Sequence, residues 1–224
     1  MVNKNKSGLM AKRISLAPNG TLAKNPAAQM AAGTVETVTA TLAELPAILA
    51  GLKSNEAIAL GVCEQAPAEI VTEKALPQHP GAVARTKDFF RMPDGLALAY
   101  FDADTDAEPE QVLGAIAQAF PAFADAAKIV LRSSSSGIYR TGEDKPVAAS
   151  KGLHIYATIR NGADFPRFGE ALCKRLWLVG RGQVEPSEAG ALLVRQSIDA
   201  ATFSPERIVF EAAPILGAGL ERRA

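Results

Sequence analysis

The chain has 224 residues, 48% of them hydrophobic, so it can bury a substantial core within one compact unit of two lobes. Its 24 basic and 24 acidic side chains balance, which excludes the strongly basic overall charge of many nucleic-acid-binding proteins. Cys63 and Cys173 lie in apolar patterns and predict a cytoplasmic protein without disulfides. The two histidines exclude a zinc site of clustered ligands, and no apolar stretch is long enough for a membrane span or secretory signal.

Charge is unevenly distributed along the chain. Residues 1–35 contain no acidic side chain but five basic ones, at Lys4, Lys6, Lys12, Arg13 and Lys24. This segment is interpreted either as a contact for nucleic-acid phosphates or as a solvated, partly disordered terminus. The sign reverses in residues 101–125, where six acidic residues gather, and a metal site needs such local negative charge.

The first half of the chain predicts a helix over 41–52, opened by a Thr-x-x-Glu capping box, and a buried strand over 57–62. Residues 64–88 are rich in Pro, Ala and charge and indicate an irregular connection. A strand over 96–102 then leads into the acidic group.

The second half alternates helices and strands. Pro109 marks the first turn of a helix, residues 128–132 indicate a strand, and a polar loop follows over 133–150. A strand over 152–159, a helix from Pro166 to Gly180 and a last strand over 191–198 complete the pattern. This order indicates an α/β or α+β sheet protein.

Asp102 and Asp104 are the first candidate catalytic residues. Side chains two apart on a strand share a face, with Cα atoms about 6.5 to 7 Å apart. Two such carboxylates can clamp a pair of divalent ions, and oxygen-only ligation is what Mg²⁺ prefers. The alternatives are a solvated acidic turn and the Asp-x-Asp pair of sugar-nucleotide transferases.

Two further strands carry candidate residues. His154 lies on the polar face of its strand, where the ring can donate to a triphosphate oxygen; the alternative is a half-exposed histidine without ligand. Asp199 follows the last strand, and Arg195 is expected on the same strand face. The two residues either form a structural ion pair, or Arg195 binds the triphosphate while Asp199 binds the metal. The serines of the polar loop, Ser134 and Ser136 among them, offer a phosphate cradle or form a plain flexible loop.

Three sequence elements in this order carry a family resemblance. They are Tyr100-Phe-Asp-Ala-Asp104, Ser150-Lys-Gly-Leu-His-Ile-Tyr156, and the apolar strand that ends in Asp199. Together with residues 132–139 and 198–210, they resemble the three motifs of archaeo-eukaryotic-type primases and primase-polymerases, above all plasmid- and phage-encoded replication primases. One departure is that Ser150 lies four residues before His154, whereas the family often has Ser-x-His.

The resemblance implies a two-lobed primase-polymerase core, with an RNA-recognition-like antiparallel sheet and a smaller α/β lobe around a catalytic cleft. The expected division is an amino-terminal lobe over 1–95, a catalytic lobe over 96–214, and a C-terminal extension over 215–224. Since family members often continue into a helical domain or a helicase, this extension is interpreted as the truncated start of a further domain.

The implied function is a DNA primase that makes short primers on single-stranded DNA by two-metal nucleotidyl transfer, in replication of a plasmid or phage. Asp102, Asp104 and Asp199 would hold two Mg²⁺ or Mn²⁺ ions. The expected ligands of the NTP or dNTP substrate are His154, Arg195, Ser150, Arg207, Ser134 and Ser136. The expected contacts to the template are Lys4, Lys6, Lys12, Arg13, Tyr139, Arg140 and Tyr156. A replicative helicase is the expected protein partner. The alternatives are a non-catalytic replication initiator that binds single-stranded DNA, and a sugar-nucleotide transferase.

Overall fold

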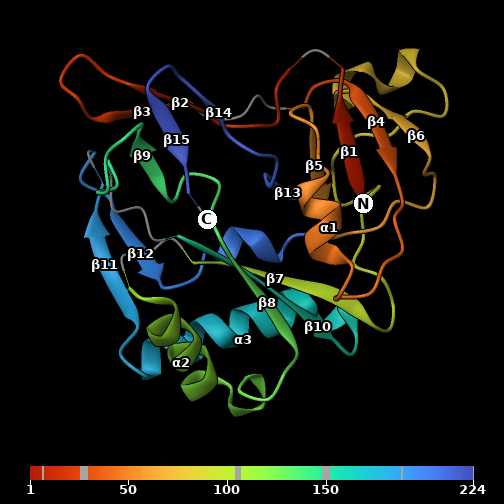
Figure 1. Cartoon of the computed structure of the whole chain (residues 1–224). Helices are drawn as coiled ribbons and strands as arrows, with labels where there is room; N and C mark the ends of the chain where they lie inside the picture. The colour runs from red at the N-terminus through yellow and green to blue at the C-terminus, as the bar shows by residue number, and fades with distance from the viewer. Residues whose placement is uncertain (7, 26–29, 104–106, 148–151, 188, 224) are drawn as a thin grey trace.

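The computed structural model describes residues 1–6, 8–25, 30–103, 107–147, 152–187 and 189–223. The protein is a mixed α/β structure with several antiparallel sheets and few helices (Figure 1). Across the described ranges, no helix is long and apolar enough to cross a membrane.

A three-stranded antiparallel sheet in the order β7-β10-β8 lies at the middle of the fold. Its strands are β7 (Ala97–Ala103), β10 (Leu153–Ile159) and β8 (Lys128–Arg132), within one residue of the predicted ranges. Side chains alternate between the two faces of such a sheet. Phe101 and Ile155 are cross-strand partners on one face, and Asp102 and His154 are partners on the other.

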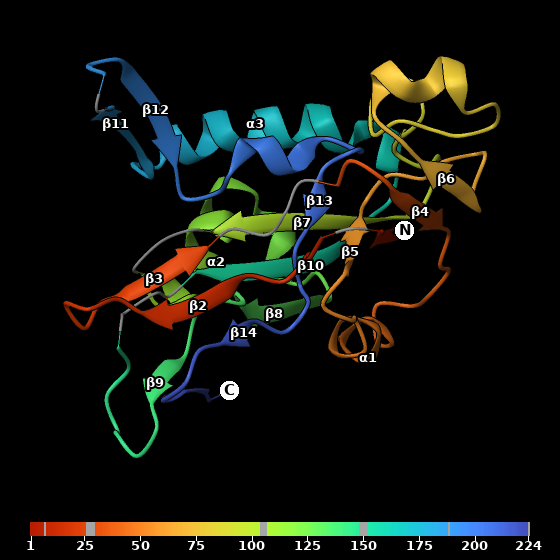
Figure 2. The same cartoon turned by 90° about the horizontal axis from the view of Figure 1, so that it is seen from above.

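Two helices, α2 (Pro109–Ala119) and α3 (Phe165–Leu178), pack on the Phe101 face (Figure 2). A reciprocal capping box between Glu108 and Gln111 begins α2, and proline stands near the start of both helices, where its missing N–H is tolerated. Phe101 makes edge contacts with Phe165 of α3 and with two phenylalanines of the 3₁₀ helices η2 (Pro121–Phe123) and η4 (Ala200–Phe203). The main core therefore lies between this face and the helices.

The amino-terminal segment folds into a second, five-stranded sheet in the order β13-β5-β1-β4-β6. The strands are β1 (Val2–Asn5), β4 (Gly33–Glu36), β5 (Glu56–Ala59), β6 (Ala68–Ile70) and β13 (Ile208–Val209). The short helix α1 (Leu45–Ala50) covers part of the predicted helix 41–52. The predicted irregular connection 64–88 contains β6 and the 3₁₀ helix η1 (Glu73–Gln78). Another 3₁₀ turn, η3 (Gly162–Asp164), precedes α3.

Three small sheets complete the structure: β14-β2-β3, β15-β9 and β11-β12. Their strands are β2 (Arg13–Leu16), β3 (Leu22–Asn25), β9 (Ile138–Arg140), β11 (Gly182–Pro186), β12 (Leu192–Gln196), β14 (Ile215–Leu216) and β15 (Leu220–Arg222).

The last strands pair with strands from earlier parts of the chain. β13 pairs with β5 of the amino-terminal sheet, β14 pairs in parallel with β2, and β15 pairs with β9. Residues 215–222 therefore complete sheet edges and bury Leu220. The expected catalytic lobe likewise contributes β13 to the sheet of the other half.

Candidate active site

The face of the central sheet that turns away from α2 and α3 carries a cluster of polar side chains. Asp102 lies opposite His154 in the register of β7 and β10, and Tyr100 lies opposite Tyr156. Residues directly opposite in antiparallel strands point to the same side, so these four side chains form one patch. The aromatic rings are packed, with Tyr100 edge-on to His154 at a centroid distance of 5.4 Å.

Glu211, between β13 and β14, contributes a buried carboxylate to this patch that the sequence interpretation missed. Nδ1 of His154 donates to Glu211 Oε1 at 2.7 Å, and the Tyr156 hydroxyl donates to the same oxygen. Assigning the proton to Nδ1 follows from the acceptor, because an ionised carboxylate can only accept. A lone acidic residue in the apolar run from Ile208 to Leu216 was the signal available in the sequence.

The bond to Glu211 fixes the orientation of the His154 ring. Its other nitrogen, Nε2, lies 3.8 Å from Asp102 Oδ1. That separation is too long for a hydrogen bond. It is short enough for one metal ion to contact both atoms, since each metal–ligand bond is about 2.1 Å long. A carboxylate that holds one histidine nitrogen so that the other can bind a metal ion is a common arrangement in metal sites.

The two tyrosines of the patch remain protonated. Burial raises the pKa of Tyr100, and the negative charges of Asp102, Glu211 and Asp199 raise it further. Burial also raises the pKa of Tyr156, and the negative charge of Glu211 raises it further. These phenols therefore serve as hydrogen-bond donors to the carboxylates: Tyr100 to Asp102, and Tyr156 to Glu211.

Asp199 is brought beside Asp102 by the backbone. Its N–H donates to the carbonyl oxygen of Asp102 at 2.8 Å. The Asp199 carboxylate accepts from the N–H of Ala201 at 2.9 Å, which makes it the N-cap of η4, and the residue is exposed. The strand before it is shorter than predicted, because β12 ends at Gln196.

Asp104, another predicted metal ligand, lies outside the described part of the chain. Among described residues, no group of three or more His, Cys, Asp or Glu side chains is close enough to hold an ion. The carboxylate oxygens of Asp102 and Asp199 are donors of the kind that Mg²⁺ and Mn²⁺ prefer. Ser150, a predicted nucleotide ligand, also lies outside the described residues.

The serine-rich segment differs from both expectations, a phosphate cradle and a flexible loop. Ser133 to Ser136 are all buried, and the Ser133 N–H and the Ser136 hydroxyl both donate to the carbonyl of Gly152 at the start of β10. Ser134 Oγ is buried without a hydrogen-bond partner among described groups. Ser134 and Ser136 are therefore not exposed to a nucleotide; the segment instead anchors the strand that carries His154.

The two predicted triphosphate arginines are both exposed. Arg195 is on the exposed β11-β12 hairpin, where its Nε lies 4.0 Å from Glu185. Because β12 ends before Asp199, the expected shared strand face of Arg195 and Asp199 is not formed. Arg207 is exposed and follows η4.

The predicted template contacts are mostly engaged within the protein. Tyr156 is 0% exposed, so it cannot stack on a base, and this expectation is corrected. Lys4 lies 3.5 Å from Glu36 and Lys6 lies 3.6 Å from Glu69, because strand pairing brings acidic side chains beside them.

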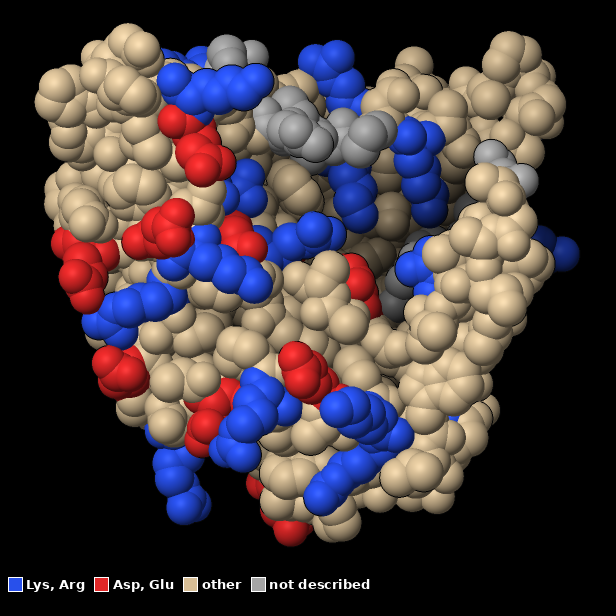
Figure 3. Space-filling model, turned by 180° about the vertical axis from the view of Figure 1, so that it is seen from behind, with Lys and Arg blue, Asp and Glu red and all other residues tan. Residues whose placement is uncertain are grey.

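The remaining predicted contacts are on the small sheets. Arg140 donates to the carbonyl of Gly20, the guanidinium of Arg223 lies over the Tyr139 ring, and Lys12 and Arg13 lie at β2. On the face seen from behind, Lys and Arg side chains gather around a hollow in its upper half (Figure 3).

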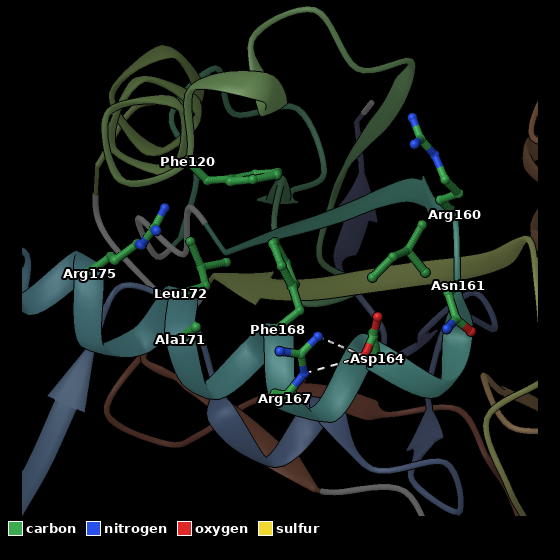
Figure 4. A pocket seen from close by; sticks show the side chains of 10 residues that line it. Phe120, Arg160, Asn161, Asp164, Arg167, Phe168, Ala171, Leu172 and Arg175 are labelled. Carbon is green, nitrogen blue, oxygen red and sulfur yellow. Dashed lines mark hydrogen bonds and ion pairs between the residues drawn. The ribbon is translucent and has the colours of Figure 1, made fainter.

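A separate pocket of about 380 Å³ opens on the helix side of the central sheet (Figure 4). Phe120, Phe168 and Leu172 line its apolar wall, while Arg167 is held by Asp164 at 2.9 Å. Since the central sheet separates this pocket from the Asp102 face, the pocket is not part of the carboxylate patch.

A scan against protein-family models, a search of curated proteins and a search of solved structures each found no match.

Proposed function

We propose that the protein is a DNA primase that synthesises short primers on single-stranded DNA, in replication of a plasmid or phage, on a two-lobed primase-polymerase core. The observation that supports this most is the hydrogen bond from the Asp199 N–H to the Asp102 carbonyl. It joins the first and third elements of the sequence resemblance, which are far apart in the chain, beside His154 of the second.

The proposed metal ligands are Asp102 and Asp199, with Asp104. Two divalent ions held by these residues would activate the attacking 3′-hydroxyl and neutralise the charge of the leaving pyrophosphate. The protein's own residues contribute by positioning the reacting groups. Glu211 holds the His154 ring so that Nε2 faces the substrate side of Asp102, and protonated Tyr100 orients the Asp102 carboxylate.

The experiment that tests the proposal is primer synthesis on single-stranded DNA with labelled nucleotides, with and without Mg²⁺ or Mn²⁺. We expect wild-type protein to form dinucleotides and longer products only with the metal. Asp102→Asn and Asp199→Asn should each reduce synthesis to background. Asp125→Asn is the matched control, since Asp125 is exposed and distant in the chain from the three sequence elements, and it should retain wild-type synthesis.

A non-catalytic initiator that binds single-stranded DNA is the second candidate, favoured by the burial of His154, which is 5% exposed. It would bind the template without a divalent ion and make no product in the same assay. The sugar-nucleotide transferase needs only Asp102 and Asp104. It would hydrolyse a nucleotide sugar, and Asp199→Asn would leave that hydrolysis intact.

A further inference from the structure

A long groove of about 1110 Å³ lies between α3, β12 and η4. Cys173 and Trp177 of α3 form one wall, and Val194 and Gln196 of β12 form another. The groove continues along η4 to Ala200 and Ala201, the residues that directly follow Asp199. Its volume lies near the upper end of the range for small-molecule sites, about 300 to 1,000 Å³.

Trp177 is the only tryptophan of the chain, and it lines this groove with 37% of its surface exposed. Its position depends on Gly182 at the start of β11, because a Cβ atom there would overlap the indole ring. The ring is thus supported by the hairpin backbone on one side. An exposed, supported aromatic ring is a platform on which nucleic-acid bases of any sequence can stack.

Three exposed basic side chains belong to the groove lining: Lys87, Lys174 and Arg207. Within the described residues, none of the three has a carboxylate at ion-pair distance. Arg85, which is half-buried beside Arg207, adds further positive charge, and burial lowers its pKa. Glu170 and Glu206 are the acidic residues of the lining, and one carboxylate oxygen of Glu206 accepts from the Ser204 hydroxyl at 2.7 Å.

We propose that this groove binds single-stranded DNA, with a base stacked on Trp177 and phosphates held by Lys174, Arg207 and Lys87. Apolar walls, an exposed indole and unpaired cations match the two surfaces of a single strand, its bases and its phosphates. The groove leads toward Asp199. Its role as the path of the template rests on the proposed function. Its binding chemistry does not depend on polymerisation.

The test uses the fluorescence of the single tryptophan. Oligothymidylate is titrated into the whole protein at several salt concentrations, without divalent ion or nucleotide. We expect saturable quenching of Trp177 that weakens steeply as salt rises. Unchanged Trp177 fluorescence while the oligonucleotide binds elsewhere would overturn the proposal. Quenching by polyglutamate but not by oligothymidylate would also overturn it and would indicate an acidic peptide as the occupant.

Variants locate the contacts by fluorescence anisotropy of a labelled oligothymidylate. Trp177→Ala should weaken binding on the order of tenfold, the range of one lost stacking contact. Lys174→Gln and Arg207→Gln should each lower the slope of log affinity against log salt by about one. The controls are Leu178→Ala, an exposed neighbour outside the lining, and Arg167→Gln on α3, and both should bind as wild type.

The two proposals fail separately. If Trp177 reports binding but no primer is made, the primase proposal fails and the groove stands. If primers are made while Trp177→Ala, Lys174→Gln and Arg207→Gln all bind template as tightly as wild type, the groove proposal fails and the primase stands.

Discussion

His154 Nδ1 lies 2.7 Å from Glu211 Oε1, and both side chains are buried on the polar face of the central sheet. The same carboxylate oxygen accepts from Tyr156, so one acidic residue satisfies two buried donors. This arrangement couples the stability of the fold to the orientation of a proposed substrate-binding residue.

Glu211→Ala is expected to destabilise the protein by about 2 to 6 kcal/mol, because it leaves two buried donors without an acceptor and each costs about 1 to 3 kcal/mol. Urea unfolding followed by circular dichroism measures this. Tyr156→Phe, which removes one donor and keeps the acceptor, is the control and should cost about 1 kcal/mol. A change for Glu211→Ala within about 0.5 kcal/mol, the range of neutral surface substitutions, would contradict the role given to Glu211.

Gly169 of α3 faces the ring of Phe203 in η4, and a Cβ atom at this position would overlap that ring. Gly169→Ala should therefore displace η4, which Asp199 caps, and destabilise the protein by about 1 to 3 kcal/mol. The matched control is Gly114→Ala in α2, where a Cβ atom meets nothing within 4 Å. It should raise thermal stability by about 0.5 to 1 kcal/mol, since alanine is the better helix former. Equal effects of the two substitutions in thermal unfolding would refute this packing argument.

The protonated tyrosines predict a loss of stability at alkaline pH. Their raised pKa values mean that the folded protein keeps these protons above about pH 10, where the unfolded chain releases them. Unfolding then releases protons, so the free energy of unfolding should fall as pH rises above about 10. Urea unfolding across this pH range should show a smaller fall in the free energy of unfolding for Tyr156→Phe than for wild type. An identical pH dependence would show that Tyr156 ionises normally in the fold.

The strands and helices of the second half were predicted well because their local signals agree with the tertiary structure. The strand predicted over 128–132 is β8 itself, and Pro109 and Pro166 mark the starts of α2 and α3. Alternation along β10 correctly separated His154 and Tyr156 from Leu153 and Ile155. These patterns depend on residues close together in sequence.

The first 35 residues and the last 20 were not predicted because their strands are short and pair with distant partners. β1 lies between β4 and β5, and β14 pairs with β2 from the other end of the chain. Strands of two to four residues give too little periodicity to detect. The same long-range pairing carries Glu211 over the Asp102 face, so the partner of His154 could not be identified from local spacing.

Asp102 and Asp199, with Asp104, are proposed to hold divalent ions together. Electron paramagnetic resonance of Mn²⁺, titrated into the protein with a nucleoside triphosphate, measures the bound ion directly and requires no turnover. We predict tight Mn²⁺ binding by wild type and by Asp125→Asn, and a marked loss in both Asp102→Asn and Asp199→Asn. Wild-type Mn²⁺ affinity in Asp199→Asn would contradict the shared site, and with it the primase proposal.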